Sequence, residues 1–198
     1  MKHGEIVIRN VVIGVLLSAL AVPAFAETRA YKTDPGHTEV RFGWNHAGVS
    51  TQHGEFDRVD GTLSIDLENP DSAVLDVTID AASVSTGFGP LDDHIKSADF
   101  LMTEKHPTIR FVSSGITKTS ESTADVQGDV TLRGVTLPAT LKVELIHKGA
   151  HPVAQFADYY KGDWLGFHAS AEIDTTPFGF ALPVGTLVFE ISTEMQAK

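Results

Sequence analysis

The chain has 198 residues, a formal net charge of −11 at pH 7 and no cysteine. The negative charge argues against nucleic acids and anionic membrane surfaces as partners, because both would repel the protein. The absence of cysteine excludes disulfides, thiol catalysis and lipid attachment through a cysteine side chain.

Residues 1–26 have the pattern of a secretory signal peptide. Lys2 and Arg9 make a basic start, an apolar run follows over residues 11–22, and Ala24-Phe25-Ala26 is an A-x-A cleavage site. As a helix the run would be about 18 Å long, shorter than the roughly 30 Å core of a bilayer. We therefore expect a periplasmic protein that is cleaved after Ala26 and folds as one domain over residues 27–198.

The rest of the chain alternates between apolar and polar residues with a period of two, which is typical of strands with one buried face. The expected strands lie at about 39–45, 62–67, 73–80, 109–117, 125–132, 141–145, 167–174 and 187–194. Turn signals such as Arg133-Gly134 and Lys161-Gly162-Asp163 separate them. About eight strands at this spacing predict an all-β antiparallel sandwich or barrel, and a parallel α/β sheet is excluded because crossover helices are missing.

One stretch, residues 86–111, interrupts this alternation. Pro90 suits the first turn of a helix, and Asp92 complements the positive end of its dipole. Pro107 favours extended backbone before it and returns the chain to a strand. We predict a short helical excursion between two strands over about residues 90–103.

No catalytic or metal-binding pattern accompanies this stretch. Adjacent Asp92 and Asp93 would point about 100° apart on a helix, so they cannot flank one glycosidic bond. None of the histidines forms an H-x-x-x-H or H-E-x-x-H pair on a helix, and none pairs with a cysteine, so no metal site is predicted. The chain also lacks a G-x-S-x-G nucleophile motif and a phosphate-binding loop. We therefore predict a protein that is not an enzyme and needs no cofactor.

The inward-facing apolar set includes the small residues Ala73, Ala169 and Ala171. An eight-stranded barrel is just wide enough to be filled by side chains or to hold one slender ligand. Alanines in its wall would leave a tunnel, or they would compensate for large neighbours in an ordinary core, and the pattern alone leaves both open. The polar faces carry many charges and the chain has only three Tyr and two Trp, so we expect no stable membrane insertion.

Six sequence fragments, taken in order, carry a family resemblance. They are Tyr31–Thr38 with its D-x-x-H spacing, Gly54–Phe56 with Gly61, Thr86-Gly87 with the D-x-H-x-K-S-x-D-F run Asp92–Phe100, Pro107–Phe111, Thr131–Thr136, and Gly166–Ala169. Each fragment is weak alone, but together they resemble the YceI family of periplasmic lipocalin-like proteins over almost the whole chain after residue 26.

The resemblance implies an eight-stranded antiparallel, lipocalin-like β-barrel whose long cavity is closed on one side by the helical excursion. It also implies non-catalytic binding, storage or transport of a long isoprenoid, such as a polyprenoid or an isoprenoid quinone, or of a similar amphiphile. The candidate lining residues are Phe42, Leu75, Val77, Ile79, Phe88, Ile95, Phe100, Phe111, Phe167, Ala169, Phe178 and Phe189. Asp92, His94 and Ser97 would orient the headgroup.

Four positions depart from the family pattern: Leu91, Leu137, Thr175 and Pro177. These departures bear on the headgroup of the ligand rather than on the fold. An alternative function is a stress-linked periplasmic module that binds a protein partner through its acidic surface. A further alternative, from a different class, is an enzyme that uses His94 with Asp92 on the bound lipid. The oligomeric state, including a homodimer, stays open.

Overall fold

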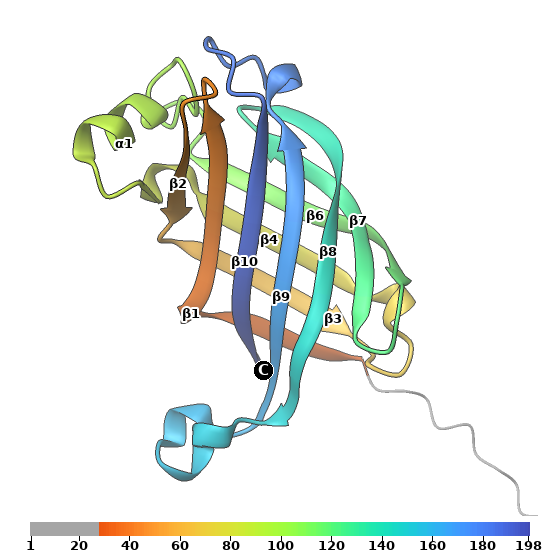
Figure 1. The fold of residues 1–198 in the computed structure, drawn as a ribbon. Helices are drawn as coiled ribbons and strands as arrows, with labels where there is room; N and C mark the ends of the chain where they lie inside the picture. Colours follow the sequence, from red (N-terminus) through yellow and green to blue (C-terminus); the bar gives the residue numbers. More distant parts are fainter. Residues whose placement is uncertain (1–27) are drawn as a thin grey trace, which may run out of the picture.

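The computed structural model describes residues 28–198, so the predicted signal peptide lies outside the described residues. Within this range eight antiparallel strands close into a barrel, because β10 pairs with β1 (Figure 1). In chain order the barrel strands are β1 (Arg29–His46), β3 (Val59–Ile65), β4 (Val74–Asp80), β6 (Thr108–Lys118), β7 (Thr123–Leu132), β8 (Val135–Ala150), β9 (Asp163–Asp174) and β10 (Thr186–Ala197). The predicted all-β barrel with one short helix is confirmed.

The long strand β1 has two different neighbours along one of its edges. Its first residues, Arg29–Lys32, pair with β3, whereas Val40–His46 pair with β2 (Ser50–Phe56). On its other edge β10 pairs with both halves, with a register shift between Thr33 and Thr38. Such a bulge bends a strand, so the two halves of β1 can pair with different neighbours in the barrel wall. The sequence predicted only the second half as a strand, because Pro35 and Gly36 interrupt the alternation.

The two-residue strand β5 (Val84–Ser85) pairs with β2 in the antiparallel direction. Short 3₁₀ turns lie in the connections: η1 (Pro70–Ser72), η2 (Ala81–Ser83), η3 (Pro152–Gln155), η4 (Asp158–Tyr160) and η5 (Thr176–Phe178). The predicted Arg133-Gly134 turn joins β7 to β8, with φ of 52° and 75° at its two residues. Positive φ at both central residues is what a two-residue hairpin of type I′ requires.

Two clusters of buried residues pack at different levels of the barrel. One contains Val40, Phe42, Phe56, Val84, Leu101, Leu132 and Phe178. The other contains Tyr31, Leu63, Ile65, Ala73, Leu165 and Met195, near the end of the barrel where the chain terminates. We call the first cluster the upper core and the second the lower core. The barrel is therefore firmly packed at several points, while other inward-facing side chains are only half-buried.

The helical excursion contains one helix, α1 (Gly89–Lys96), followed by turns rather than by more helix. Pro90 lies in its first turn, as predicted. The helix ends at Ser97, whose hydroxyl donates a hydrogen bond of 2.7 Å to the carbonyl oxygen of His94. The helix is thus shorter than the predicted excursion over 90–103. Ser97 has an extended backbone conformation, and its hydroxyl caps a free carbonyl group of the last turn.

The excursion is fastened to two other loops at the upper end of the barrel. The Arg133 guanidinium donates a hydrogen bond of 2.5 Å to the carbonyl oxygen of Phe100. The backbone N–H of Ala181 donates one of 2.8 Å to the carbonyl oxygen of Asp99. The Phe100 ring also meets the edge of Phe180 at 5.9 Å. In Figure 1 α1 lies beside β2, at the end of the barrel opposite the C terminus.

Candidate functional site

A cavity of about 900 Å³ runs through the barrel. All eight barrel strands contribute apolar side chains to its wall, because the period-two alternation turns every second residue inward. Ligand pockets in proteins commonly measure about 300–1,000 Å³, so this cavity lies near the upper end of that range.

The two ends of the cavity differ in character. One end is lined by Asn45 and His46 at the end of β1, by Ala47 of the β1–β2 turn, by residues 182–184 of the β9–β10 loop and by Phe88. Phe88 and Leu182 are 63% and 47% exposed there, so large apolar side chains at this rim are open to solvent. The other end lies at the β6–β7 turn and is lined by polar residues, including Lys118 and Glu121. We regard the apolar rim as the candidate entrance.

Alanine side chains leave space for the cavity along part of the barrel wall. Ala169 pairs with Val143 on β8 and with Ile191 on β10, and Ile191 pairs with Val40 on β1. All four side chains line the cavity, as does Ala171. Ala73, in contrast, packs in the lower core. The structure therefore places two of the three alanines at the cavity and one in an ordinary core.

Most of the predicted lining residues do face the cavity. These are Phe42, Leu75, Val77, Ile79, Phe88, Ile95, Phe100, Phe111, Phe167, Ala169 and Phe189, together with His94, which was expected to orient a headgroup. The wall also contains Val40, Trp44 and Ile191, which belong to the predicted apolar strand faces but were not among the candidate lining residues. The alternation that placed Phe42 and Phe189 inward would have found them, because they lie two residues away on the same strands.

Three predicted residues lie elsewhere. Phe178, the last residue of the 3₁₀ turn η5, is 3% exposed and packs in the upper core instead of lining the cavity. The Asp92 carboxylate accepts hydrogen bonds from the backbone N–H (2.7 Å) and the hydroxyl (2.6 Å) of Thr86. The Ser97 hydroxyl caps the C-terminal end of the helix and accepts a hydrogen bond from the backbone N–H of Asp99. Asp92 and Ser97 therefore hold the excursion in shape and do not line the cavity.

His94 lies at the cavity wall in α1, but it is not paired with Asp92. Its Nε2 atom lies 3.1 Å from a carboxylate oxygen of Asp99, and its ring meets the edge of Phe100 at 4.9 Å. Asp92 is engaged with Thr86 instead. The two residues named for the enzymatic alternative are thus held apart by separate partners.

The positions that depart from the family pattern have different roles. Leu91 lines the cavity, next to His94 and Ile95. Leu137 packs against the upper core. Thr175 is 1% exposed, and its hydroxyl donates a hydrogen bond of 2.7 Å to the carbonyl oxygen of Gly185. Pro177 lies in η5. Of the four positions, Leu91 alone reaches the cavity.

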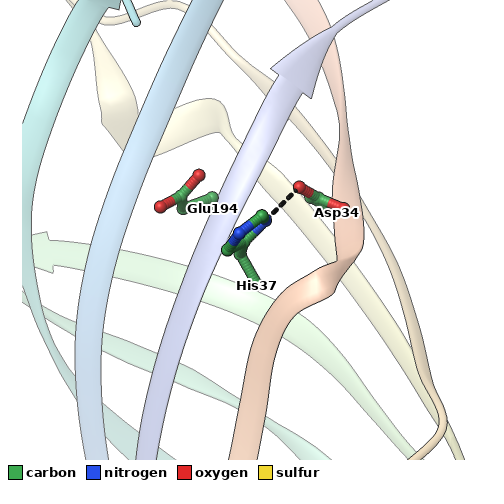
Figure 2. Close-up of side chains that lie close together, drawn as sticks. All are labelled: Asp34, His37 and Glu194. Carbon is green, nitrogen blue, oxygen red and sulfur yellow. Dashed lines mark hydrogen bonds and ion pairs between the residues drawn. The ribbon is translucent and has the colours of Figure 1, made fainter. Parts of the chain in front are cut away.

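A second cluster of polar residues lies at the other end of the barrel, near the C terminus. Asp34 and His37 sit in the bend of β1, and Glu194 is on β10 (Figure 2). One ligand-type atom from each residue lies within 4.8 Å of the other two. Among the described residues these three form the group of histidine and carboxylate side chains that could hold a metal ion.

Hydrogen bonding shifts the pKa values in this cluster. Burial by itself would raise the pKa of Asp34, but hydrogen bonds from His37, Gly36 and Tyr159 outweigh it and hold the pKa below its ordinary value. The hydrogen bond to Asp34 raises the pKa of His37 against a smaller opposing effect of burial, and the charges of Asp34 and Glu194 add to the rise. The structure therefore favours an ionised Asp34 beside a protonated His37.

No helix within residues 28–198 is long and apolar enough to span a membrane.

The chain is similar to known proteins over most of its length. The YceI-like domain model matches residues 31–197. A UPF0312 protein of Ectopseudomonas mendocina (strain ymp) is 35% identical over 171 residues, covering 85% of this chain and 84% of the relative.

Solved structures show the same fold. BcnA of Burkholderia cenocepacia superimposes with a TM-score of 0.71 at 18% identity, covering 82% of this chain and 98% of that chain. A polyisoprenoid-binding domain from Saccharophagus degradans, implicated in plant cell wall breakdown, superimposes with a TM-score of 0.58 at 14% identity, covering 86% and 99%. The two solved structures show that the fold is shared. The match of the family model and the 35% identical relative show that the chain belongs to the YceI-like family.

Proposed function

We propose that this protein binds one long isoprenoid chain, a polyprenoid or an isoprenoid quinone, or a similar amphiphile inside the barrel, and stores or carries it in the periplasm without reacting with it. The observation that carries the proposal is the cavity of about 900 Å³ with an apolar wall from all eight strands. The polyisoprenoid-binding domain of Saccharophagus degradans, which has the same fold, supports it.

The energetics of burial suit such a ligand. Each methylene group transferred from water to an apolar wall contributes about 0.8 kcal/mol. A long hydrocarbon chain therefore binds tightly without a strong polar contact, provided that the cavity admits it along its length. The apolar rim at Phe88 and Leu182 offers an entrance that does not require the chain to pass a layer of charges.

The headgroup would stay near that rim. Asn45, His46, Gln52 and His94 line the cavity at the same end and supply hydrogen-bond donors and acceptors. A quinone carbonyl or a polyprenol hydroxyl can accept such bonds while its tail extends toward the β6–β7 turn. Three residues were expected to orient the headgroup, and two of them, Asp92 and Ser97, hydrogen-bond within the excursion instead. We propose that the third, His94, contacts the headgroup.

The periplasmic location rests on residues 1–26, with their basic start, apolar run and A-x-A site. Cell fractionation and N-terminal sequencing test it directly. The exported protein should begin at Glu27, and a product that keeps residue 1 and stays in the cytoplasm would contradict this part of the proposal.

Ligand binding is tested on protein purified without detergent from cells that make isoprenoid quinones. Extraction with organic solvent followed by mass spectrometry should recover a lipid with an isoprenoid chain, close to one molecule per protein. The stripped protein should then gain thermal stability with quinones or polyprenols. A protein that is empty in every preparation and gains no stability from either lipid would refute the proposal.

The alternative function, a protein-binding module acting through its acidic surface, has less support within residues 28–198. Asp76 and Asp80 on β4 already pair with Arg110 and Arg58, respectively. It stays a prediction, and it would be favoured if cavity variants bound a protein partner as well as the wild type does.

A further inference from the structure

The polar cluster near the C terminus brings together residues from opposite ends of the chain. Asp34 and His37 lie three residues apart in the bend of β1, where the register with β10 shifts. The Asp34 Oδ2 and His37 Nδ1 atoms are 2.7 Å apart. Glu194 lies on β10, and one of its carboxylate oxygens is within 4.8 Å of the ligand-type atoms of Asp34 and His37 (Figure 2). One nitrogen and two carboxylate oxygens therefore converge.

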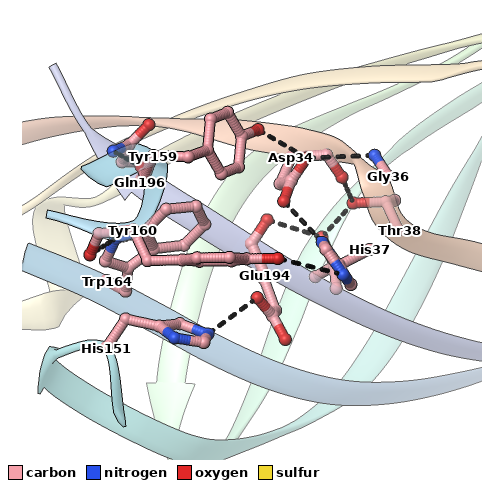
Figure 3. Close-up of polar contacts among 11 residues, drawn as sticks. Asp34, Gly36, His37, Thr38, His151, Tyr159, Tyr160, Trp164, Glu194 and Gln196 are labelled. Carbon is pink, nitrogen blue, oxygen red and sulfur yellow. Dashed lines mark hydrogen bonds and ion pairs between the residues drawn. The ribbon is translucent and has the colours of Figure 1, made fainter. Parts of the chain in front are cut away.

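Each of these three side chains has a second polar atom that is held by an outer partner (Figure 3). Asp34 Oδ1 accepts hydrogen bonds from the Gly36 N–H (3.0 Å) and the Tyr159 hydroxyl (2.9 Å). His37 Nε2 lies 3.4 Å from the Tyr160 hydroxyl. Orienting contacts of this kind behind the ligand atoms are characteristic of metal centres.

Glu194 is oriented in the same manner by His151. The His151 Nδ1 atom accepts the backbone N–H of Val153 at 3.1 Å, so in the neutral ring the proton sits on Nε2. That Nε2–H lies 3.1 Å from Glu194 Oε2 and donates to it. His151 therefore has no lone pair to offer an ion at this point. It fixes the orientation of the Glu194 carboxylate.

The charges of the cluster favour a divalent cation. Two carboxylates converge on one imidazole here, and the Asp34 side chain is only 3% exposed. A divalent ion that displaces the proton from His37 Nδ1 would pair with both carboxylates and leave the group electrically neutral. Metal binding with release of a proton is the usual behaviour of histidine ligands.

We infer that Asp34, His37 and Glu194 form a binding site for a divalent first-row transition-metal ion such as Zn²⁺, with the remaining coordination position open to water. Zn²⁺ is bound by imidazole nitrogen and carboxylate oxygen, and sites with three protein ligands keep an open position. Mg²⁺ and Ca²⁺ prefer oxygen ligands alone, so the imidazole disfavours them.

The rearrangement needed to admit the ion is small. Bonds of about 2.1 Å in a tetrahedral site place neighbouring ligand atoms about 3.4 Å apart. The Asp34 and His37 atoms must separate slightly from 2.7 Å, and the longest separation in the group, at most 4.8 Å, must shorten. The bound ion would join β1 to β10 and, through Tyr159, Tyr160 and His151, to the loop between β8 and β9. We therefore expect it to stabilise the folded protein.

The test is a calorimetric titration of the metal-stripped protein with ZnCl₂ at about pH 8, above the ordinary histidine pKa of about 6.5. Wild type should bind one ion per chain, and its melting temperature should rise with Zn²⁺. Glu194→Gln should weaken binding by about 100-fold. The matched control is Glu190→Gln, which makes the same charge change on the outer face of the same strand, beside Arg41, and should bind as wild type does.

A titration with no saturable binding, or equal binding in all three proteins, would overturn the inference. A second measurement on the wild type does not depend on the folding of a variant. One equivalent of Co²⁺, which is paramagnetic, should shift or broaden the His37 ring signals in the NMR spectrum before those of His53 and His168. If those histidines respond first, Asp34, His37 and Glu194 are not the metal site.

Discussion

The substitution Ala169→Phe addresses the cavity most directly. Ala169 lies between Val143 and Ile191 in a row of inward-facing residues, and its methyl group lines the cavity. A phenyl ring needs space on the order of 150 Å³, the size of an engineered cavity that holds benzene. The cavity of about 900 Å³ has room for the ring, so the barrel should fold, but the ring would block the path of a long chain.

The expected loss of affinity follows from the length of chain that is displaced. Excluding four methylene groups from the wall costs about 3 kcal/mol, which is more than a hundredfold in Kd. The matched control is Ser170→Phe, which adds a ring to the outer face of the same strand. It should leave ligand binding unchanged, because neighbouring strand residues point to opposite faces.

Two assays report on this variant. Extraction and mass spectrometry give the amount of lipid that co-purifies with each protein. Trp44 lines the cavity, so quenching of its fluorescence by an added quinone gives the affinity. If Ala169→Phe folds and still binds the ligand with wild-type stoichiometry and affinity, the lipid does not occupy the barrel and the reasoning fails.

Three further predictions concern the surroundings of the two sites. Asp92→Ala removes the acceptor of the Thr86 hydrogen bonds and should lower the free energy of unfolding in urea by about 1–3 kcal/mol, with the bound lipid unchanged. Gly128→Ala would place a Cβ atom 2.4 Å from a backbone oxygen of β6 and should destabilise by roughly 1–3 kcal/mol in the same measurement. In metal-free protein, His37→Gln should destabilise most at mildly acidic pH, where His37 is protonated. The effect should fade as pH rises through the elevated pKa of His37, because a raised folded-state pKa contributes stability only below it.

Each of these has a clear contrary outcome. If Asp92→Ala loses its lipid while keeping wild-type stability, Asp92 contacts the headgroup after all. A Gly128→Ala protein as stable as wild type would show that β6 and β7 move apart easily. A His37→Gln protein whose deficit is constant or grows toward alkaline pH would show that the ion pair with Asp34 does not stabilise the fold. Urea titrations across the pH range measure this last quantity.

The alternation of apolar and polar residues was enough to predict the class of fold. Runs such as 73–80 and 187–194 repeat every two residues, and this period is a local property that any strand with one buried face displays. Pro90 and Pro107 marked the excursion for the same local reason, since proline restricts its own φ and the residue before it. Together with the order of the six fragments, these signals predicted the barrel and most of its inward-facing residues.

The closure of the barrel and the partners of its polar residues depended on contacts between distant parts of the chain. Nothing near Asp92 indicates that its carboxylate binds Thr86, and the 3₁₀ turn that buries Phe178 depends on the loop that follows β9. Asp34 and His37 meet Glu194 only because β1 pairs with β10 to close the barrel. Local periodicity specifies which face of a strand is buried, whereas strand pairing decides which side chains become neighbours. The sequence by itself determined an apolar barrel interior, and the tertiary structure alone decided where that interior stays hollow and where charged groups converge.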